Sequence, residues 1–106
     1  MSNFEIKKQA AAGTLESSDM QIIIDKNDNN GIEIELQSSV EKQYGRRIRQ
    51  LIKDTLSEMG IDHVKCVVTD KGALDCTIVA RTVAAVHRAS EISSNYDWEE
   101  MDTWNV

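Results

Sequence analysis

The chain has 106 residues, of which 41% are hydrophobic and 28% are charged, and its formal net charge is -6. This length suits one domain with a single modest core, and the composition is that of a soluble globular chain. The acidic balance disfavours a nucleic-acid partner, whose phosphates are neutralised by Lys and Arg, and favours protein partners. The chain has no run of about 18 apolar residues for a membrane span and no export signal, so a cytoplasmic location is expected.

The acidic charge is concentrated at the C-terminal end. Residues 91–106 contain five acidic residues and no Lys or Arg, so residues 1–90 carry a net charge of only -1. We therefore expect a folded domain over residues 1–90 and an acidic tail over residues 91–106. Acidic tails are commonly disordered. This tail also contains Tyr96, Trp98 and Trp104, and because aromatic residues are enriched at interfaces, ordering on a protein partner is the alternative.

The N-terminal third of the chain predicts two strands. Residues 1–12 end in three alanines and predict either a short helix or a frayed arm. Residues 20–25 are rich in isoleucine and residues 32–37 alternate apolar and polar, so both predict strands. Residues 26–31 form a polar turn between them, which predicts a hairpin. A calcium loop is disfavoured because the run has no glutamate at its twelfth position and no flanking helices.

A long amphipathic helix is predicted next. Ser38 and Glu41 match a capping box at its start, and Gly60 suits the C′ position at its end. The apolar stripe comprises Val40, Tyr44, Ile48, Leu51, Ile52, Leu56 and Met59. The other face is basic, with Lys42, Arg46, Arg47, Arg49 and Lys53. Such a face is either solvated with local ion pairs or a docking surface for a phosphorylated arm or an acidic partner.

The remaining sequence predicts a second hairpin and a second helix. Residues 64–69 and 74–79 are interpreted as paired strands, with Cys66 and Cys76 reduced and facing the core. Residues 80–90 return to a helical period. The predicted fold is therefore α+β: two ββα units forming a four-stranded, mostly antiparallel sheet with two helices on one face. The two cysteines and two histidines, His63 and His87, do not form a metal-site pattern.

Residues 13–19, with the sequence GTLESSD, contain two candidate functional hydroxyls. Ser17 and Ser18 beside carboxylates are either a turn or cap, or a serine displayed for covalent attachment. A negative group on Ser17 would lie beside Glu16 and Asp19, which is tolerable only if the loop is exposed. We therefore predict an exposed loop. The histidines are distant in sequence and no Gly-x-Ser-x-Gly motif exists, which disfavours a hydrolase.

Three stretches together resemble one known family. Residues 13–19 (GTLESSD), 39–45 (SVEKQYG) and 70–76 (DKGALDC) are similar to the acyl carrier protein, or gamma chain, of citrate lyase. The resemblance implies that Ser17 carries a 2'-(5''-phosphoribosyl)-3'-dephospho-coenzyme A group through a phosphodiester, with Ser18 as the weaker candidate. This phosphopantetheine-like prosthetic group would make the chain a phosphoprotein.

The resemblance also implies a function and partners. The chain is expected to be a non-catalytic carrier whose arm bears acetyl and citryl thioesters while citrate is cleaved to acetate and oxaloacetate. The implied partners are the transferase (alpha) and lyase (beta) subunits of a hetero-oligomer in citrate fermentation, and the enzyme that installs the arm. The alternatives are a carrier of malonate decarboxylase or citramalate lyase, or an unmodified protein-interaction module. Residues 70–76 favour citrate lyase over malonate decarboxylase.

Overall fold

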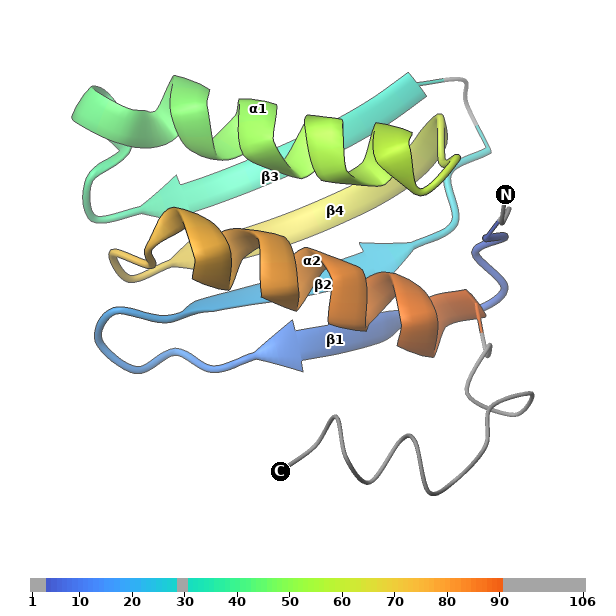
Figure 1. The fold of residues 1–106 in the computed structure, drawn as a ribbon, viewed down its shortest axis with the longest axis horizontal. Coiled ribbons are helices and arrows are strands. Elements are labelled where there is room, and N and C mark those ends of the chain that lie inside the picture. The colour runs from blue at the N-terminus through green and yellow to red at the C-terminus, as the bar shows by residue number, and fades with distance from the viewer. Residues whose placement is uncertain (1–3, 29–30, 91–106) are drawn as a thin grey trace.

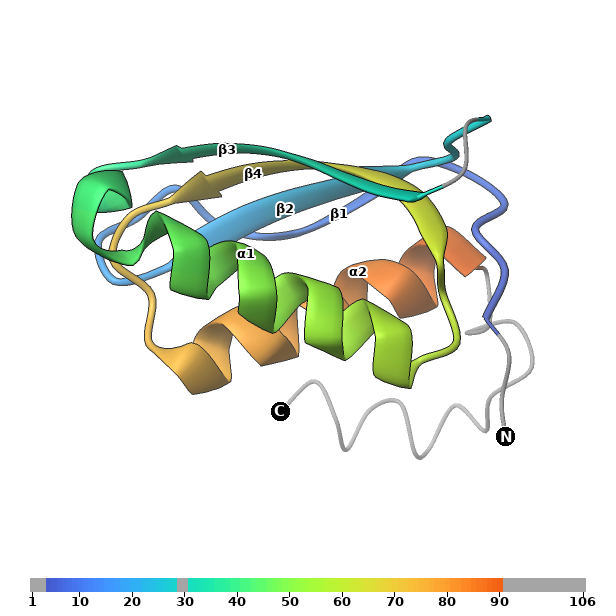
Figure 2. The same ribbon diagram turned by 90° about the horizontal axis from the view of Figure 1, so that it is seen from above.

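The computed structural model describes residues 4–28 and 31–90. The elements, in chain order, are β1 (Ala10–Gly13), β2 (Met20–Asp25), β3 (Gly31–Ser38), α1 (Glu41–Glu58), β4 (His63–Asp70) and α2 (Asp75–Ser90). The strands form one sheet in the order β1-β2-β4-β3, and both helices cover the same face of it (Figures 1 and 2). The predicted α+β sheet of four strands with two helices on one face is confirmed. The predicted acidic tail lies outside the described residues.

The strand pairing is mixed, because β4 lies between β2 and β3. β4 is antiparallel to β2, with Ile22 opposite Val68, and parallel to β3. The predicted hairpin of residues 20–25 with 32–37 is therefore wrong, although both strands exist. A parallel neighbour needs a crossover, and α1 supplies it by connecting β3 to β4. A strand, a helix and a strand in succession is a signal for this arrangement.

The second predicted hairpin is also wrong, because residues 75–79 belong to α2. The buried positions of α2 recur at helical spacing from Ile78 through Thr82 and Val86. Residues 74–79 largely alternate apolar and polar, which is typical of a strand, but the stretch is too short to exclude a helix. Helical geometry turns Cys76 outward, so this thiol is exposed, whereas Cys66 on β4 is buried as predicted.

The alanine run forms β1 and not a helix or an arm. It pairs antiparallel with β2, with Ala12 opposite Ile22, and the side chain of Ala12 is buried. Arg88 of α2 donates to the carbonyl of Ala11 over 2.8 Å, which ties the edge strand to the helix above it. Preceding β1, Phe4 packs against the core and its ring lies 4.9 Å from that of His87.

α1 ends as predicted but begins differently. Gly60 has φ +80°, its N–H bonds to Ser57, and the N–H of Ile61 bonds to Leu56, which together form a Schellman motif. The N-cap residue is Val40 and no side chain caps it, so the predicted capping box is wrong. Of the predicted stripe, Ile48, Ile52 and Leu56 are buried, but Tyr44 is 51% exposed.

The core lies between the sheet and the two helices. β2 and β4 alternate buried and exposed residues, as strands with one covered face do. Their buried side chains, including Ile24 and Val64, meet Ile52 and Leu56 of α1 and Val86 of α2 in one hydrophobic cluster. In the described part of the chain, neither helix has the apolar length that crossing a bilayer requires.

Candidate functional site

Residues 14–19 connect β1 to β2, and we call this segment the serine loop. It lies at the end of the sheet where β3 runs into α1 and β4 runs into α2 (Figure 1). Ser17 and Ser18 are both exposed, so the prediction of an exposed loop is confirmed. The loop follows β1, and hydrogen bonds to Asp19 fix its base.

The base of the serine loop is fixed by Asp19. Arg81 of α2 donates two hydrogen bonds to this carboxylate, from Nε to Oδ1 and from a terminal nitrogen to Oδ2, both over 2.9 Å. Thr14 donates to Oδ2 over 2.6 Å, so one side chain joins both ends of the loop to α2. These bonds to the charged form, with Arg81 first, hold the pKa of Asp19 well below its ordinary range. Asp19 is therefore ionised and its charge is balanced.

Gly13 allows the chain to enter the loop close to β2. Its φ is +93°, and a Cβ atom there would lie 1.8 Å from the carbonyl oxygen of Met20 and 3.2 Å from Cδ of Arg81. Any other residue would therefore clash with the backbone and crowd the arginine that binds Asp19. The glycine of the sequence motif is required for close packing at the base of the loop.

Ser17 and Ser18 occupy different positions in one tight turn. The N–H of Asp19 bonds to the carbonyl of Glu16 over 3.1 Å, which places the two serines at the central positions of a β-turn. Ser18 has φ +65°, the only positive value among the described non-glycine residues. Its N–H donates to the carbonyl of Lys71 over 2.8 Å. The backbone of Ser18 is therefore held against a neighbouring segment, whereas Ser17 is at the outer corner of the turn.

That neighbouring segment is the connection between β4 and α2, residues 71–74. The N–H of Lys71 bonds back to the carbonyl of Asp19 over 2.9 Å, so the two connections share a short ladder. Asp70, 1% exposed, holds the connection in shape. Its carboxylate accepts the N–H groups of Gly72 at 3.1 Å and Ala73 at 3.0 Å and the hydroxyl of Ser38 at 2.9 Å. Asp70 thus joins the ends of β3 and β4.

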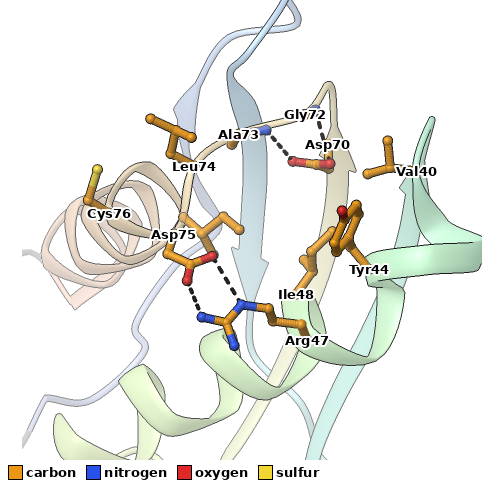
Figure 3. A pocket seen from close by; sticks show the side chains of 11 residues that line it. Val40, Tyr44, Arg47, Ile48, Asp70, Gly72, Ala73, Leu74, Asp75 and Cys76 are labelled. Carbon is orange, nitrogen blue, oxygen red and sulfur yellow. Dashed lines mark hydrogen bonds and ion pairs between the residues drawn. The ribbon is translucent and has the colours of Figure 1, made fainter.

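A groove of about 610 Å³ lies beside this ladder, between the start of α1 and the β4–α2 connection. Its lining is largely apolar and includes Val40, Tyr44, Ile48, Ala73, Leu74 and Ile78. Figure 3 shows an ion pair within it, in which Arg47 of α1 binds Asp75 of α2. This pair lowers the pKa of Asp75 and raises that of Arg47. Arg47 on the predicted basic face is therefore engaged in a specific ion pair.

The two histidines and the buried cysteine lie away from the serine loop. His63 begins β4 and bonds to Asp62 over 2.7 Å, and His87 lies in the last turn of α2, where burial lowers its pKa. Burial raises the pKa of Cys66 to about 12. Among the described residues, no three His, Cys, Asp or Glu side chains gather as a metal site would require. Neither histidine lies at the end of the sheet that carries Ser17.

Sequence reasoning found the loop but missed what supports it. No local pattern indicates a partner for Arg81, because Asp19 lies 62 positions earlier. Asp70 is the last residue of β4 and not part of a hairpin turn, and its bond to Ser38 spans 32 positions. The one available signal was the presence of Asp19 and Asp70 within two of the three motif stretches.

The chain matches the family described as malonate decarboxylase delta subunit (MdcD) over residues 7–89. It is 58% identical over 102 residues to a citrate lyase acyl carrier protein of Streptococcus equi subsp. equi, covering 96% of this chain and 99% of that protein. A citrate lyase acyl carrier protein of Streptococcus pyogenes serotype M5 is 57% identical with the same coverage.

A solved structure shares the fold. A chain in the crystal structure of a Pseudomonas malonate decarboxylase hetero-tetramer in complex with malonate superposes with a TM-score of 0.62 at 16% identity, covering 83% of this chain and 90% of that one. This likeness concerns the fold alone. The family match and the near-full-length identity go further, and the predicted resemblance is confirmed: the chain belongs to the citrate lyase acyl carrier protein family.

Proposed function

We propose that this chain is the acyl carrier subunit of citrate lyase and that the oxygen of Ser17 carries a 2'-(5''-phosphoribosyl)-3'-dephospho-coenzyme A arm through a phosphodiester. The observation that carries the proposal is the position of Ser17, exposed at the corner of a turn whose base is fixed by Asp19 and Arg81. A hydroxyl at such a corner is accessible to another enzyme, and the fixed base holds it in one place.

The residues present fit this group. A phosphodiester on Ser17 would lie near Glu16 and Asp19, but the charge of Asp19 is already balanced by Arg81. Glu16 is exposed, so its repulsion is weakened by water to about 0.7 kcal/mol at roughly 6 Å. When bound, the arm supplies a thiol that holds an acyl group as a thioester. The chain's own contribution is to present Ser17 in a solvated, nearly neutral setting.

Ser17 is a better attachment point than Ser18. The N–H of Ser18 is bonded to the carbonyl of Lys71 and its backbone is in the left-handed region, so the backbone that a transferase must approach is held against the β4–α2 connection, although the side chain is exposed. Neither His63 nor His87 lies near either hydroxyl, so the attaching enzyme must activate it. This requirement fits a carrier that is modified by another protein.

Citrate is the proposed substrate of the complex, because the near-full-length relatives are citrate lyase carriers. Acetyl and citryl thioesters would then form on the arm in turn as citrate is cleaved to acetate and oxaloacetate. The proposed partners are the transferase (alpha) and lyase (beta) subunits, in the cytoplasm of a citrate-fermenting cell. An enzyme that installs the prosthetic group is the third proposed partner.

The test is the intact mass of the protein purified from its own cells during growth on citrate, followed by fragment mapping. We expect the mass to exceed that of the bare chain by one phosphoribosyl-dephospho-coenzyme A group, and the added mass to map to the fragment that contains Ser17. A bare chain under these conditions would overturn the carrier function. It would instead favour an unmodified interaction module.

A further inference from the structure

We propose that the groove between α1 and the β4–α2 connection is a binding site for the pantetheine end of the arm attached to Ser17. The proposal rests on the proposed function, because it requires an arm. It assigns to this chain a second role, in which the carrier holds the reactive end of its own arm between visits to other proteins.

The groove lies within reach of Ser17. Ser18 is bonded to Lys71 over 2.8 Å, and Leu74, in the groove wall, is three residues farther along the chain. With 3.8 Å between consecutive Cα atoms, the path from Ser17 to Leu74 is on the order of 20 Å at most. An arm that contains a phosphoribose, an adenosine, a diphosphate and a pantetheine is long enough to follow this path.

The lining suits a flexible chain of methyl and amide groups. Leu74 is 69% exposed and Tyr44 is 51% exposed, so covering them would remove apolar surface from water. The volume of about 610 Å³ falls within the range of small-ligand sites. Arg47 and Asp75, both partly exposed, offer donors and acceptors to amide groups. Pantetheine, with its dimethyl centre and two amides, has this mixture of apolar and hydrogen-bonding groups.

The charges along the path favour this arm. Lys71 is exposed beside the serine loop, and Arg47 lies in the groove with its side chain 63% exposed. Lys71 can attract the diphosphate that precedes pantetheine, whereas the charge of Arg47 is balanced by Asp75. Attachment to Ser17 also gives the arm an effective concentration in the millimolar range, as for a short flexible linker. A shallow groove with only millimolar affinity would therefore be substantially occupied by the arm, whereas a free ligand would rarely fill it.

Cys76 provides a reporter of occupancy, because it is exposed and its residue lines the groove. Figure 3 shows it on the α2 side, near Leu74. The starting material is intact protein whose arm has been verified by mass and freed of its acyl group with hydroxylamine. Limiting diamide is then added. The arm thiol and the Cys76 thiol lose two protons and two electrons to form one disulfide, and diamide is reduced to the hydrazine.

We expect this intramolecular disulfide to form about tenfold faster than one to an exposed control cysteine outside the groove. The control is Ser39→Cys combined with Cys76→Ser, because Ser39 is exposed in the β3–α1 turn at the same end of the sheet. Tyr44→Ala and Leu74→Gln change exposed groove residues without adding charge and should each slow the reaction several-fold. Lys53→Ala, exposed farther along α1, should leave the rate unchanged.

Three results would overturn the proposal. Starting protein without an arm on Ser17 would remove both this inference and the proposed function. Protein that carries the arm but forms the disulfide at the same rate in Tyr44→Ala, Leu74→Gln and wild type would overturn the groove site alone. The third result concerns alkylation of Cys76. If the other subunits of the complex protect Cys76 of the armless protein from alkylation, but the arm alone does not protect it, the groove is a binding surface for a partner subunit.

Discussion

Two connections meet at one end of this molecule, and an aspartate organises each of them. Asp19 fixes the serine loop through an ion pair with Arg81, whereas Asp70 fixes the β4–α2 connection by accepting backbone N–H groups and a hydroxyl. Asp70 is 1% exposed, but Arg81 is 38% exposed, so water reaches the first arrangement and not the second. The difference suggests that Asp70 serves mainly stability and that Asp19 serves mainly the position of Ser17.

Alanine substitution of two glycines with positive φ, one at each connection, should give the largest difference in the free energy of unfolding. Gly13→Ala should lower the free energy of unfolding by about 3 kcal/mol, because its Cβ would overlap the carbonyl of Met20. Gly72 has φ +89° with nothing within 4 Å of a Cβ, so Gly72→Ala should cost only about 1 kcal/mol. Urea unfolding measures both variants. Equal losses would show that packing at Gly13 is unimportant.

Asp70→Ala should be the next most destabilising change. It leaves the N–H groups of Gly72 and Ala73 and the hydroxyl of Ser38 without their acceptor, at an expected cost of about 2 kcal/mol in urea unfolding. The matched control is Asp62→Ala, an aspartate whose side chain is 91% exposed, which should change stability by less than about 0.5 kcal/mol. A loss no larger than that of the control would contradict the structural role of Asp70.

In contrast to Asp70→Ala, Arg81→Leu should change the free energy of unfolding little and the rate of arm attachment more. We expect a loss of about 1 kcal/mol in stability, because the ion pair is partly exposed. Attachment of the arm to Ser17 should slow several-fold, since the loop loses its fixed base. Intact mass over time after induction measures the attachment, and Arg46→Leu on α1 is the control. An unchanged rate of attachment would show that the ion pair of Asp19 and Arg81 does not position Ser17.

The contribution of Asp19 should also depend on pH in a defined direction. Its folded-state pKa is lowered, so the stabilisation is complete above the unfolded value of about 3.9 and is lost as the pH falls below it. The stability difference between wild type and Arg81→Leu should therefore be constant near neutrality and shrink below about pH 4. Urea unfolding across this range measures it. A difference that grows on acidification would contradict the assignment.

The same contrast explains how much could be predicted from the sequence. The serine loop was found because its residues are contiguous, and the end of α1 was found because Gly60 is a local signal. β1 was missed because alanine favours helices, whereas here the small side chain of Ala12 fits beneath α2 and β2 supplies the hydrogen bonds. The order of β2, β4 and β3 depends on long-range pairings, and the succession of β3, α1 and β4 is a signal only for the parallel pair β3 and β4.

The groove and the ion pair of Asp19 and Arg81 could not be predicted from the sequence for a related reason. Tyr44 follows the apolar period of α1. It is nevertheless exposed, because it lies at the start of the helix, where its side chain lines the groove. Arg81 and Asp19 are on separate elements, and only the completed sheet brings them together. Positions that serve a site through long-range contacts therefore need the structure, whereas a contiguous motif does not.

The most direct test of the account compares two variants, Ser17→Ala and Ser18→Gly, each purified from its native cells and measured by intact mass. The account predicts no added arm on Ser17→Ala. It predicts full addition on Ser18→Gly, because glycine adopts the positive φ of that position and keeps the N–H that bonds to Lys71. An arm that persists on Ser17→Ala and disappears from Ser18→Gly would contradict the central claim that the turn presents Ser17.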